Sequence, residues 1–185
     1  MNLVIQHPGL SDDAVRGIAA ELGRAPAQRD MQTARWTGTG LDGRGAAALG
    51  ARFGVDAAAV PPGRRMSDFR LIAFDMDSTL ITIECVDEIA DFAGRKAEVA
   101  AITEAAMRGE ISDYCESLRR RVALLAGLGA DALQRVFDER LRITPGAKPL
   151  IDRARAAGLK VLLVSGGFTY FTDRLRAQLD LDFVR

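Results

Sequence analysis

The sequence predicts an α/β fold with a parallel-sheet core, a helical bundle inserted into that core, and a small α/β region in front of it. Three observations support this prediction. Two short runs, 71–74 and 161–164, are entirely apolar, which is typical of buried strands in a parallel sheet. Between them, apolar residues recur at helical spacing. Before them, the chain is broken by Pro61, Pro62 and Gly63.

Length, composition and charge indicate an ordinary globular protein without a strongly basic surface. The chain has 185 residues, of which 48% are hydrophobic and 27% charged, as in an ordinary globular protein. Lys plus Arg and Asp plus Glu are equal at 25 each. Without an excess of basic residues, neither nucleic acid nor an anionic membrane is an expected partner.

The sequence also favours a cytoplasmic location. No apolar run approaches the roughly 20 residues that span a bilayer, and the N-terminus lacks the pattern of a secretory signal. The two cysteines, Cys85 and Cys115, are too few for a disulfide framework, so we expect reduced and partly buried thiols.

The N-terminal region, residues 1–66, is expected to be a small α/β unit. Residues 2–6 form a short apolar strand pattern, and 31–37 a second one. Ser11 is a good N-cap for a helix that reaches about Leu22. An alanine-rich helix follows the glycines of 38–45 and ends near Gly54.

Residues 83–143 are expected to form an all-helical cap. Four apolar stripes at i, i+3, i+4 spacing predict four helices, enough for a compact bundle. The stripes comprise Val86, Ile89, Ala90 and Ala93; Val99, Ile102 and Ala106; Tyr114, Leu118, Val122 and Leu125; and Leu133, Val136, Phe137 and Leu141.

The cap interrupts a core made of residues 67–82 and 144–185. After the cap, Pro145-Gly146 begins a helix that Gly158 ends, and strand 161–164 follows. A glycine loop then leads into a helix that reaches about Leu179. This order predicts a doubly wound, Rossmann-like parallel sheet.

Two carboxylates, Asp75 and Asp77, follow the first core strand. Ligands of parallel sheets bind at the carboxyl ends of strands, so the position suits a functional site. Two like charges at close range repel, and a divalent cation would relieve that repulsion. Oxygen ligands beside a phosphate favour Mg²⁺. Taken alone, however, Asp-x-Asp is more often a helix cap or a turn.

A second loop, Ser165-Gly166-Gly167, follows the second core strand and precedes a helix. Glycines let backbone N–H groups approach a phosphate closely, and a helix N-terminus favours negative charge. On its own this loop is a weak signal. The chain has a single histidine, His7, so catalysis by histidine is hard to build and carboxylates are the expected catalytic groups.

These motifs resemble those of a known family. Asp75-Met76-Asp77-Ser78-Thr79 is similar to the first motif of the haloacid dehalogenase superfamily, and Ser165-Gly166 to its second. More specifically, 75–90, 117–125 and 164–169 resemble the phosphoserine phosphatases. The resemblance runs from about Asp68 to the last residue. It implies a Mg²⁺-dependent hydrolysis of O-phospho-L-serine to L-serine and phosphate, the last step of serine biosynthesis.

The resemblance also implies roles for the carboxylates and the glycine loop. Asp75 would attack phosphorus, become an aspartyl-phosphate and bind Mg²⁺ through its carboxylate. Asp77 would protonate the leaving serine oxygen, activate the hydrolytic water and bind the metal through its backbone carbonyl. Ser165 and Gly166 would hold the phosphate.

Three further roles fall on the cap. Glu84 would receive the substrate ammonium, Arg121 would pair with the substrate carboxylate, and Met107 would help to cover the pocket. Without the resemblance, Glu84 is an ordinary acid at a helix N-terminus, and Arg119 to Arg121 are an ordinary solvated helix face.

The family has two later motifs, a lysine and a Gly-Asp-Gly-x-Asn-Asp-like loop that completes the Mg²⁺ site. Neither motif follows Ser165 in this sequence. We therefore expect the sequence to be C-terminally truncated relative to the family. We also expect weak Mg²⁺ binding and slow turnover. The alternatives are an inactive fragment that acts as a binding module and a related phosphomonoesterase with another small substrate. A homodimer is an open possibility.

Overall fold

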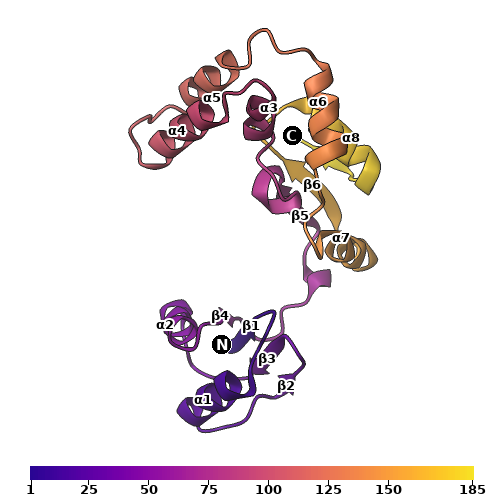
Figure 1. Ribbon diagram of the computed structural model, residues 1–185. Helices are drawn as coiled ribbons and strands as arrows, with labels where there is room; N and C mark the ends of the chain where they lie inside the picture. The colour runs from indigo at the N-terminus through magenta and orange to yellow at the C-terminus, as the bar shows by residue number, and fades with distance from the viewer. The chain divides into compact units, whose positions relative to one another are not determined.

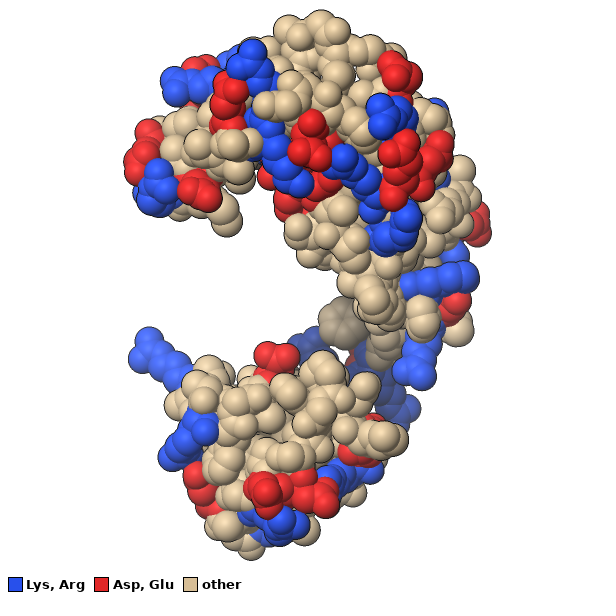
Figure 2. Space-filling model, in the orientation of Figure 1, with Lys and Arg blue, Asp and Glu red and all other residues tan.

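The chain forms two compact units, residues 1–65 and 66–185, in the computed structural model, which describes residues 1–185 (Figure 1). Each unit has a hydrophobic core of its own. On the face that Figure 2 shows, acidic and basic side chains are interspersed in both units. No helix is long and apolar enough to cross a membrane.

The N-terminal unit is a four-stranded antiparallel sheet with the strand order β2-β3-β1-β4. Its β-α-β-β-α-β sequence and strand order are those of a ferredoxin-like fold. The two helices pack against one face of the sheet, around the buried Trp36 and Ile5. In chain order the elements are β1 (Asn2–Gln6), α1 (Asp12–Leu22), β2 (Gln28–Arg29), β3 (Thr33–Trp36), α2 (Gly43–Phe53) and β4 (Asp56–Val60).

The helix boundaries of this unit follow from local chemistry. The Ser11 side chain accepts a hydrogen bond from the backbone N–H of Ala14 at 3.1 Å, which confirms the predicted start of α1. Gly54 adopts a left-handed conformation with φ of 65° and ends α2, as the sequence predicts. The predicted helices and the strand within 31–37 are thus confirmed.

Strand β4 was not predicted, because its alanines are poor indicators of a strand. Pairing with β1 determines its conformation, and Ile5 lies opposite Ala57. The small side chains also let α2 lie close to β4. A Cβ atom at Gly50 would be 2.6 Å from the Val55 carbonyl oxygen and 2.9 Å from the Ala57 Cβ. Alanine and glycine are therefore selected here by close packing.

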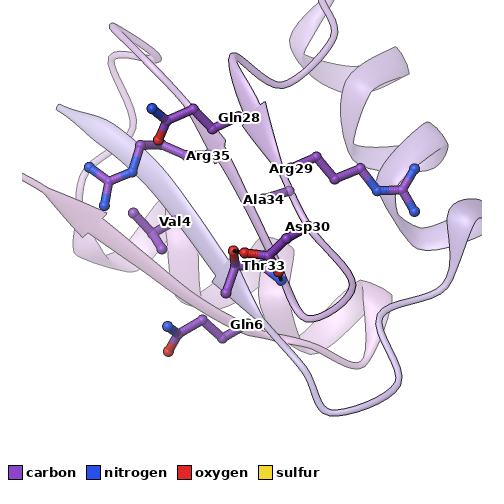
Figure 3. Close-up of a pocket in the computed structure, with 8 residues that line it drawn as sticks. All are labelled: Val4, Gln6, Gln28, Arg29, Asp30, Thr33, Ala34 and Arg35. Atoms are coloured by element: carbon purple, nitrogen blue, oxygen red, sulfur yellow. Dashed lines mark hydrogen bonds between the residues drawn. The ribbon is translucent and has the colours of Figure 1, made fainter. Parts of the chain in front are cut away.

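The other face of this sheet is open and holds a shallow cavity of about 340 Å³. Figure 3 shows Val4, Gln28 and Arg35 side by side on this face. Arg29 points away and pairs with Asp12 of α1. The residues that line this cavity are mostly polar.

The C-terminal unit contains the predicted parallel sheet, with the order β5-β6-β7. Strand β5 (Leu71–Asp75) lies next to β6 (Lys160–Val164), and the short β7 (Phe183–Val184), which was not predicted, completes the sheet. Helices α7 (Ala147–Ala156) and α8 (Thr169–Leu179) connect these strands. The α/β class with a parallel sheet is confirmed.

The prediction that both core strands are buried on both faces is wrong. Val161 and Leu163 are fully buried with the apolar residues of α7 and α8, and Ile72 and Phe74 pack against the same cluster. On the opposite face Leu71 and Val164 are 46% and 45% exposed. The reason is that, within this chain, helices cover only one face of the sheet, so alternate residues of each strand face solvent.

The residues predicted to form a helical cap contain four α-helices: α3 (Cys85–Phe92), α4 (Lys96–Met107), α5 (Tyr114–Ala123) and α6 (Asp131–Arg135). Val86, Ala90 and Val99 form a small core between the first two. The fourth predicted stripe extends beyond α6 into a turn of π-helix, Val136–Arg140. Of the two cysteines, Cys85 is buried, whereas Cys115 is exposed, so the expectation of two partly buried thiols is wrong for Cys115 because its stretch of α5 faces solvent.

Asp182 connects the start of β6 to β7, and we expect it to make the stability of this unit pH-dependent. Its carboxylate accepts from the Val161 N–H at 2.9 Å and from the Lys160 ammonium at 2.7 Å. These two hydrogen bonds hold the pKa of Asp182 below its ordinary value of 3.8, and the bond from Lys160 has the larger effect. The stabilisation is therefore present above the unfolded-state pKa and is lost as the pH falls through the lower folded-state pKa.

We predict that Asp182→Asn lowers the free energy of unfolding by about 1 kcal/mol at pH 7, because it removes a charge-assisted bond. The difference from the unchanged chain should shrink toward zero as the pH falls below 3.8. Urea titrations at several pH values measure it, with Asp173→Asn, an exposed aspartate of α8, as the control. A destabilisation that does not change with pH would contradict the role of the charge.

Candidate active site

The parallel pairing of β5 with β6 brings two loops to the same edge of the sheet. Asp75 is the last residue of β5 and lies opposite Val164, the last residue of β6. The chain continues from Asp75 into a tight turn, and from Val164 into the glycine loop. The two motifs that the sequence analysis singled out are therefore neighbours in space.

The turn after β5 is anchored at both ends. Met76 and Leu80 are fully buried in the core of the unit. The Asp77 Oδ1 atom accepts a hydrogen bond of 3.0 Å from the backbone N–H of Cys85, the first residue of α3. Asp77 is thus held by the helix that follows the turn. Asp75, by contrast, is exposed and has one long contact of 3.4 Å, from the Thr79 hydroxyl.

Ser78 binds the side chain of Glu84 next to the two carboxylates. Its backbone is left-handed, with φ of 51°, which is unusual for a residue other than glycine. The Ser78 N–H donates to the Ile83 carbonyl at 3.1 Å, and its hydroxyl donates to Glu84 Oε1 at 2.7 Å. The turn therefore fixes the place of Glu84 at the start of the cap.

Asp77 lies in a setting that disfavours its charged form. Burial, as the largest cause, raises the pKa of its carboxyl group, and the negative charges of Glu84 and Asp75 add to this. Hydrogen bonds from the Cys85 N–H and side chain act in the opposite direction. Asp77 consequently holds a proton more readily than an aspartate in water does.

The glycine loop packs against the Asp77 turn. The Ser165 side-chain oxygen accepts a hydrogen bond of 3.0 Å from the Gly167 N–H, which folds the loop back on itself. A Cβ atom at Gly167 would lie 3.1 Å from the Met76 Cε and 3.5 Å from Asp77 Oδ2. Glycine therefore allows the loop to pack closely on Met76, beside the Asp77 carboxylate.

A cavity of about 640 Å³ opens over these two loops, between the core and the cap helices α4 and α5. All seven residues that the sequence analysis proposed for the site line this one cavity: Asp75, Asp77, Glu84, Met107, Arg121, Ser165 and Gly166. The structure thus brings together residues that are up to about ninety positions apart in the sequence.

Arg121 differs from the two arginines before it. Arg119 and Arg120 are exposed, and Arg120 pairs with Glu116 at 2.7 Å. Arg121 is half-buried against the cavity, and its Nε atom is buried without a hydrogen-bond partner. A buried donor without a partner costs about 1 to 3 kcal/mol, so this group is poised for an acceptor in the cavity.

Tyr114 and Ser117 also line the cavity, and the sequence analysis did not assign either of them to the site. Tyr114 was predicted to belong to the apolar stripe of its helix, but its side chain is 58% exposed. That part of the prediction is wrong because Tyr114 is the first residue of α5, at the cavity mouth. Helical spacing alone gives no signal that distinguishes a cavity-lining tyrosine from a core one.

The donor set of the site suits a hard cation. Asp75 and Asp77 offer only oxygen, and the Asp75 carboxylate is not engaged by any cation of the chain. They do not belong to a group of three or more potential metal-binding side chains. Two oxygen-bearing residues fit Mg²⁺, which binds through one or two carboxylates and takes its other ligands from waters and substrate phosphate.

Comparison with known proteins agrees with this picture. Residues 69–184 match the family model described as haloacid dehalogenase-like hydrolase. A phosphoserine phosphatase of Polaromonas sp. (strain JS666) is 68% identical over 124 residues, which are 67% of this chain and 52% of that protein. The chain therefore spans about half the length of the curated relatives it matches.

Two solved structures are similar. One is a HAD family hydrolase from Salmonella enterica serovar Typhi, with a TM-score of 0.79 and 28% sequence identity. The match covers 100% of this chain and 66% of the hydrolase chain. The other is a phosphoserine phosphatase solved as a phospho-aspartyl intermediate analogue, with a TM-score of 0.58 and 39% sequence identity. The match covers 62% of this chain and 54% of the phosphatase chain. The first similarity includes the N-terminal unit.

We predict that Ser78→Ala lowers the free energy of unfolding by about 1 kcal/mol, because it removes the hydrogen bond to Glu84. Alanine, like serine, keeps a Cβ atom in a left-handed conformation, so the backbone strain remains. Ser78→Gly is the matched control. It loses the same bond but relieves the backbone strain, so it should be more stable than the alanine variant. Urea denaturation measures both, and equal stability of the two variants would contradict the strain at Ser78.

Proposed function

This chain belongs to the haloacid dehalogenase-like hydrolase family, and from that premise we propose that it carries the nucleophile and the substrate-recognition residues of a phosphoserine phosphatase. One observation supports this proposal above the others. A single cavity faces two core carboxylates and a glycine loop on one side, and Glu84 and the unpartnered Arg121 on the other.

In the first step, an oxygen of the Asp75 carboxylate attacks phosphorus and the bond between phosphorus and the serine oxygen breaks. Asp77 gives its proton to the serine oxygen as it leaves. The product of this step is L-serine and an aspartyl-phosphate at Asp75. The exposure of Asp75 and the protection of Asp77 suit this division of roles.

In the second step, Asp77, now a carboxylate, takes a proton from a water molecule. The oxygen of that water attacks phosphorus, and the bond between phosphorus and the Asp75 oxygen breaks. Phosphate is released and both carboxyl groups return to their starting states. Ser165 and the Gly166 N–H hold the phosphoryl oxygens throughout, since catalysis of phosphoryl transfer depends mainly on positioning and charge.

The cap residues would select the amino acid. Phosphoserine carries an ammonium and a carboxylate in addition to its phosphate. Glu84, fixed by Ser78, would receive the ammonium, and Arg121 would pair with the carboxylate in a bidentate manner. Met107, which is 84% exposed at the end of α4, would cover the pocket once substrate is present.

Mg²⁺ is the cofactor that fits this site. The Asp75 carboxylate and the Asp77 backbone carbonyl would hold it. When bound, it supplies positive charge that offsets the repulsion between the anionic nucleophile and the phosphate.

The experiment that tests the proposal measures phosphate release from phosphoserine with and without Mg²⁺. It compares the 185-residue chain with a chimera in which the remaining C-terminal part of the Polaromonas phosphatase follows Arg185. Mg²⁺-dependent release of phosphate by either protein supports the proposal. If neither protein releases phosphate, the proposal is contradicted and a binding role is favoured.

We predict that Asp75→Asn abolishes phosphate release and the trapping of label from ³²P-phosphoserine, because an amide cannot form the aspartyl-phosphate. Rapid acid quench followed by gel autoradiography detects the labelled protein. Asp173→Asn, at an exposed residue that does not line the cavity, is the control and should label normally. Turnover of Asp75→Asn at the rate of the unchanged protein would refute the mechanism.

We predict that Arg121→Ala raises the KM for phosphoserine by about 30-fold, which corresponds to the loss of about 2 kcal/mol from a buried ion pair. The KM for 4-nitrophenyl phosphate, which has no carboxylate, should change little. Arg119→Ala is the matched control, because Arg119 lies on the same helix but is exposed. Equal losses on the two substrates would remove Arg121 from substrate selection.

A further inference from the structure

Tyr114 joins the cap to the phosphate-binding loop of the core. It is the first residue of α5, and the Asp113 carboxylate stabilises that helix start by accepting from the Cys115 N–H at 2.9 Å. The tyrosine side chain reaches across the cavity to Gly166, which follows β6. This is a contact between two elements that are about fifty residues apart.

The absence of a side chain at Gly166 lets the Tyr114 phenol approach the loop backbone closely. The backbone of Gly166 does not have a positive φ, so its conformation is open to any residue. A Cβ atom there would overlap the Tyr114 phenol oxygen and lie 2.9 Å from its Cζ. The phenol of Tyr114 therefore lies against the backbone of Gly166, and a side chain at 166 would push the phenol out of this place.

Two hydrogen-bond donors at this contact are free. The Tyr114 hydroxyl makes no hydrogen bond within the chain, and neither does the Gly166 N–H. The neighbouring Ser165 oxygen accepts from the Gly167 N–H, which leaves the Ser165 hydroxyl hydrogen free to donate. Phenol, amide and serine hydroxyl thus line the same cavity at the end of β6, where they can donate to a phosphoryl group.

We propose that Tyr114 is a substrate-binding residue, whose phenol donates a hydrogen bond to the phosphoryl oxygen held at Ser165 and Gly166. This inference rests on the proposed function in that the bound group is a phosphate. It adds a recognition element from the cap to a subsite otherwise built from the core. Phosphate binding would consequently fasten α5 to the core loop.

The test compares Tyr114→Phe with the unchanged protein, in both the 185-residue chain and the chimera. The probe is inorganic phosphate in the presence of Mg²⁺, titrated by calorimetry, and phosphoserine hydrolysis is measured in parallel. Because phenylalanine keeps the ring and loses only the hydroxyl, we expect the Kd for phosphate to rise about tenfold. The matched control is Tyr170→Phe, whose hydroxyl bonds Gln134 outside the cavity, and its phosphate affinity should not change.

Equal phosphate affinity of Tyr114→Phe and the unchanged protein would overturn the inference, and so would an unchanged protein that does not bind phosphate. A weaker affinity in Tyr114→Phe alone supports it. If phosphate binding weakens in this way but neither protein hydrolyses phosphoserine, the phosphate-binding role of Tyr114 stands and the proposed function fails. The two proposals are thus tested separately.

Discussion

The parallel pairing of β5 with β6 is the constraint on which the site depends. Its register places Asp75 opposite Val164, so the chain leaves both strands at the same edge of the sheet. Every group of the core side of the cavity lies within three residues of one of these two strand ends. A shift of the register by one residue would reverse which side chains of β5 face the helices and would bury the charge of Asp75.

The turn after β5 connects the paired strands to the start of the cap. Its buried residues, Met76 and Leu80, fix the backbone, while Asp77 and Ser78 between them bond to groups at the start of α3. The same few residues therefore determine the positions of Asp75, Asp77 and Glu84. Positioning of the reacting groups depends on how rigidly such a segment is held, so its strain at Ser78 is consistent with a functional role.

Sequence reasoning predicts the helices well, because apolar spacing, N-cap residues and terminal glycines are local signals. It also finds Asp75 and Ser165, because each follows an apolar strand. It fails where tertiary contacts decide. The alanines of β4 become a strand only by pairing with β1, and the exposed face of β5 depends on which helices pack beside it. Tyr114 resembles a core residue until Gly166 of a distant loop is found against it.

The locally unfavourable features of the C-terminal unit gather in the cavity and in the turn beside it. Ser78 adopts a left-handed backbone, burial raises the pKa of Asp77, and the Arg121 Nε atom has no partner. The other non-glycine residue with positive φ, Asp180, has an ordinary explanation as the C-cap of α8. Each of these features lowers stability by itself, and the Arg121 Nε atom has no neighbouring side chain that offsets its cost. Such a concentration is expected where residues are selected for binding a ligand at the expense of stability. Under the proposed function, the carboxylate of a zwitterionic phosphate monoester would be the acceptor that the Arg121 Nε atom lacks.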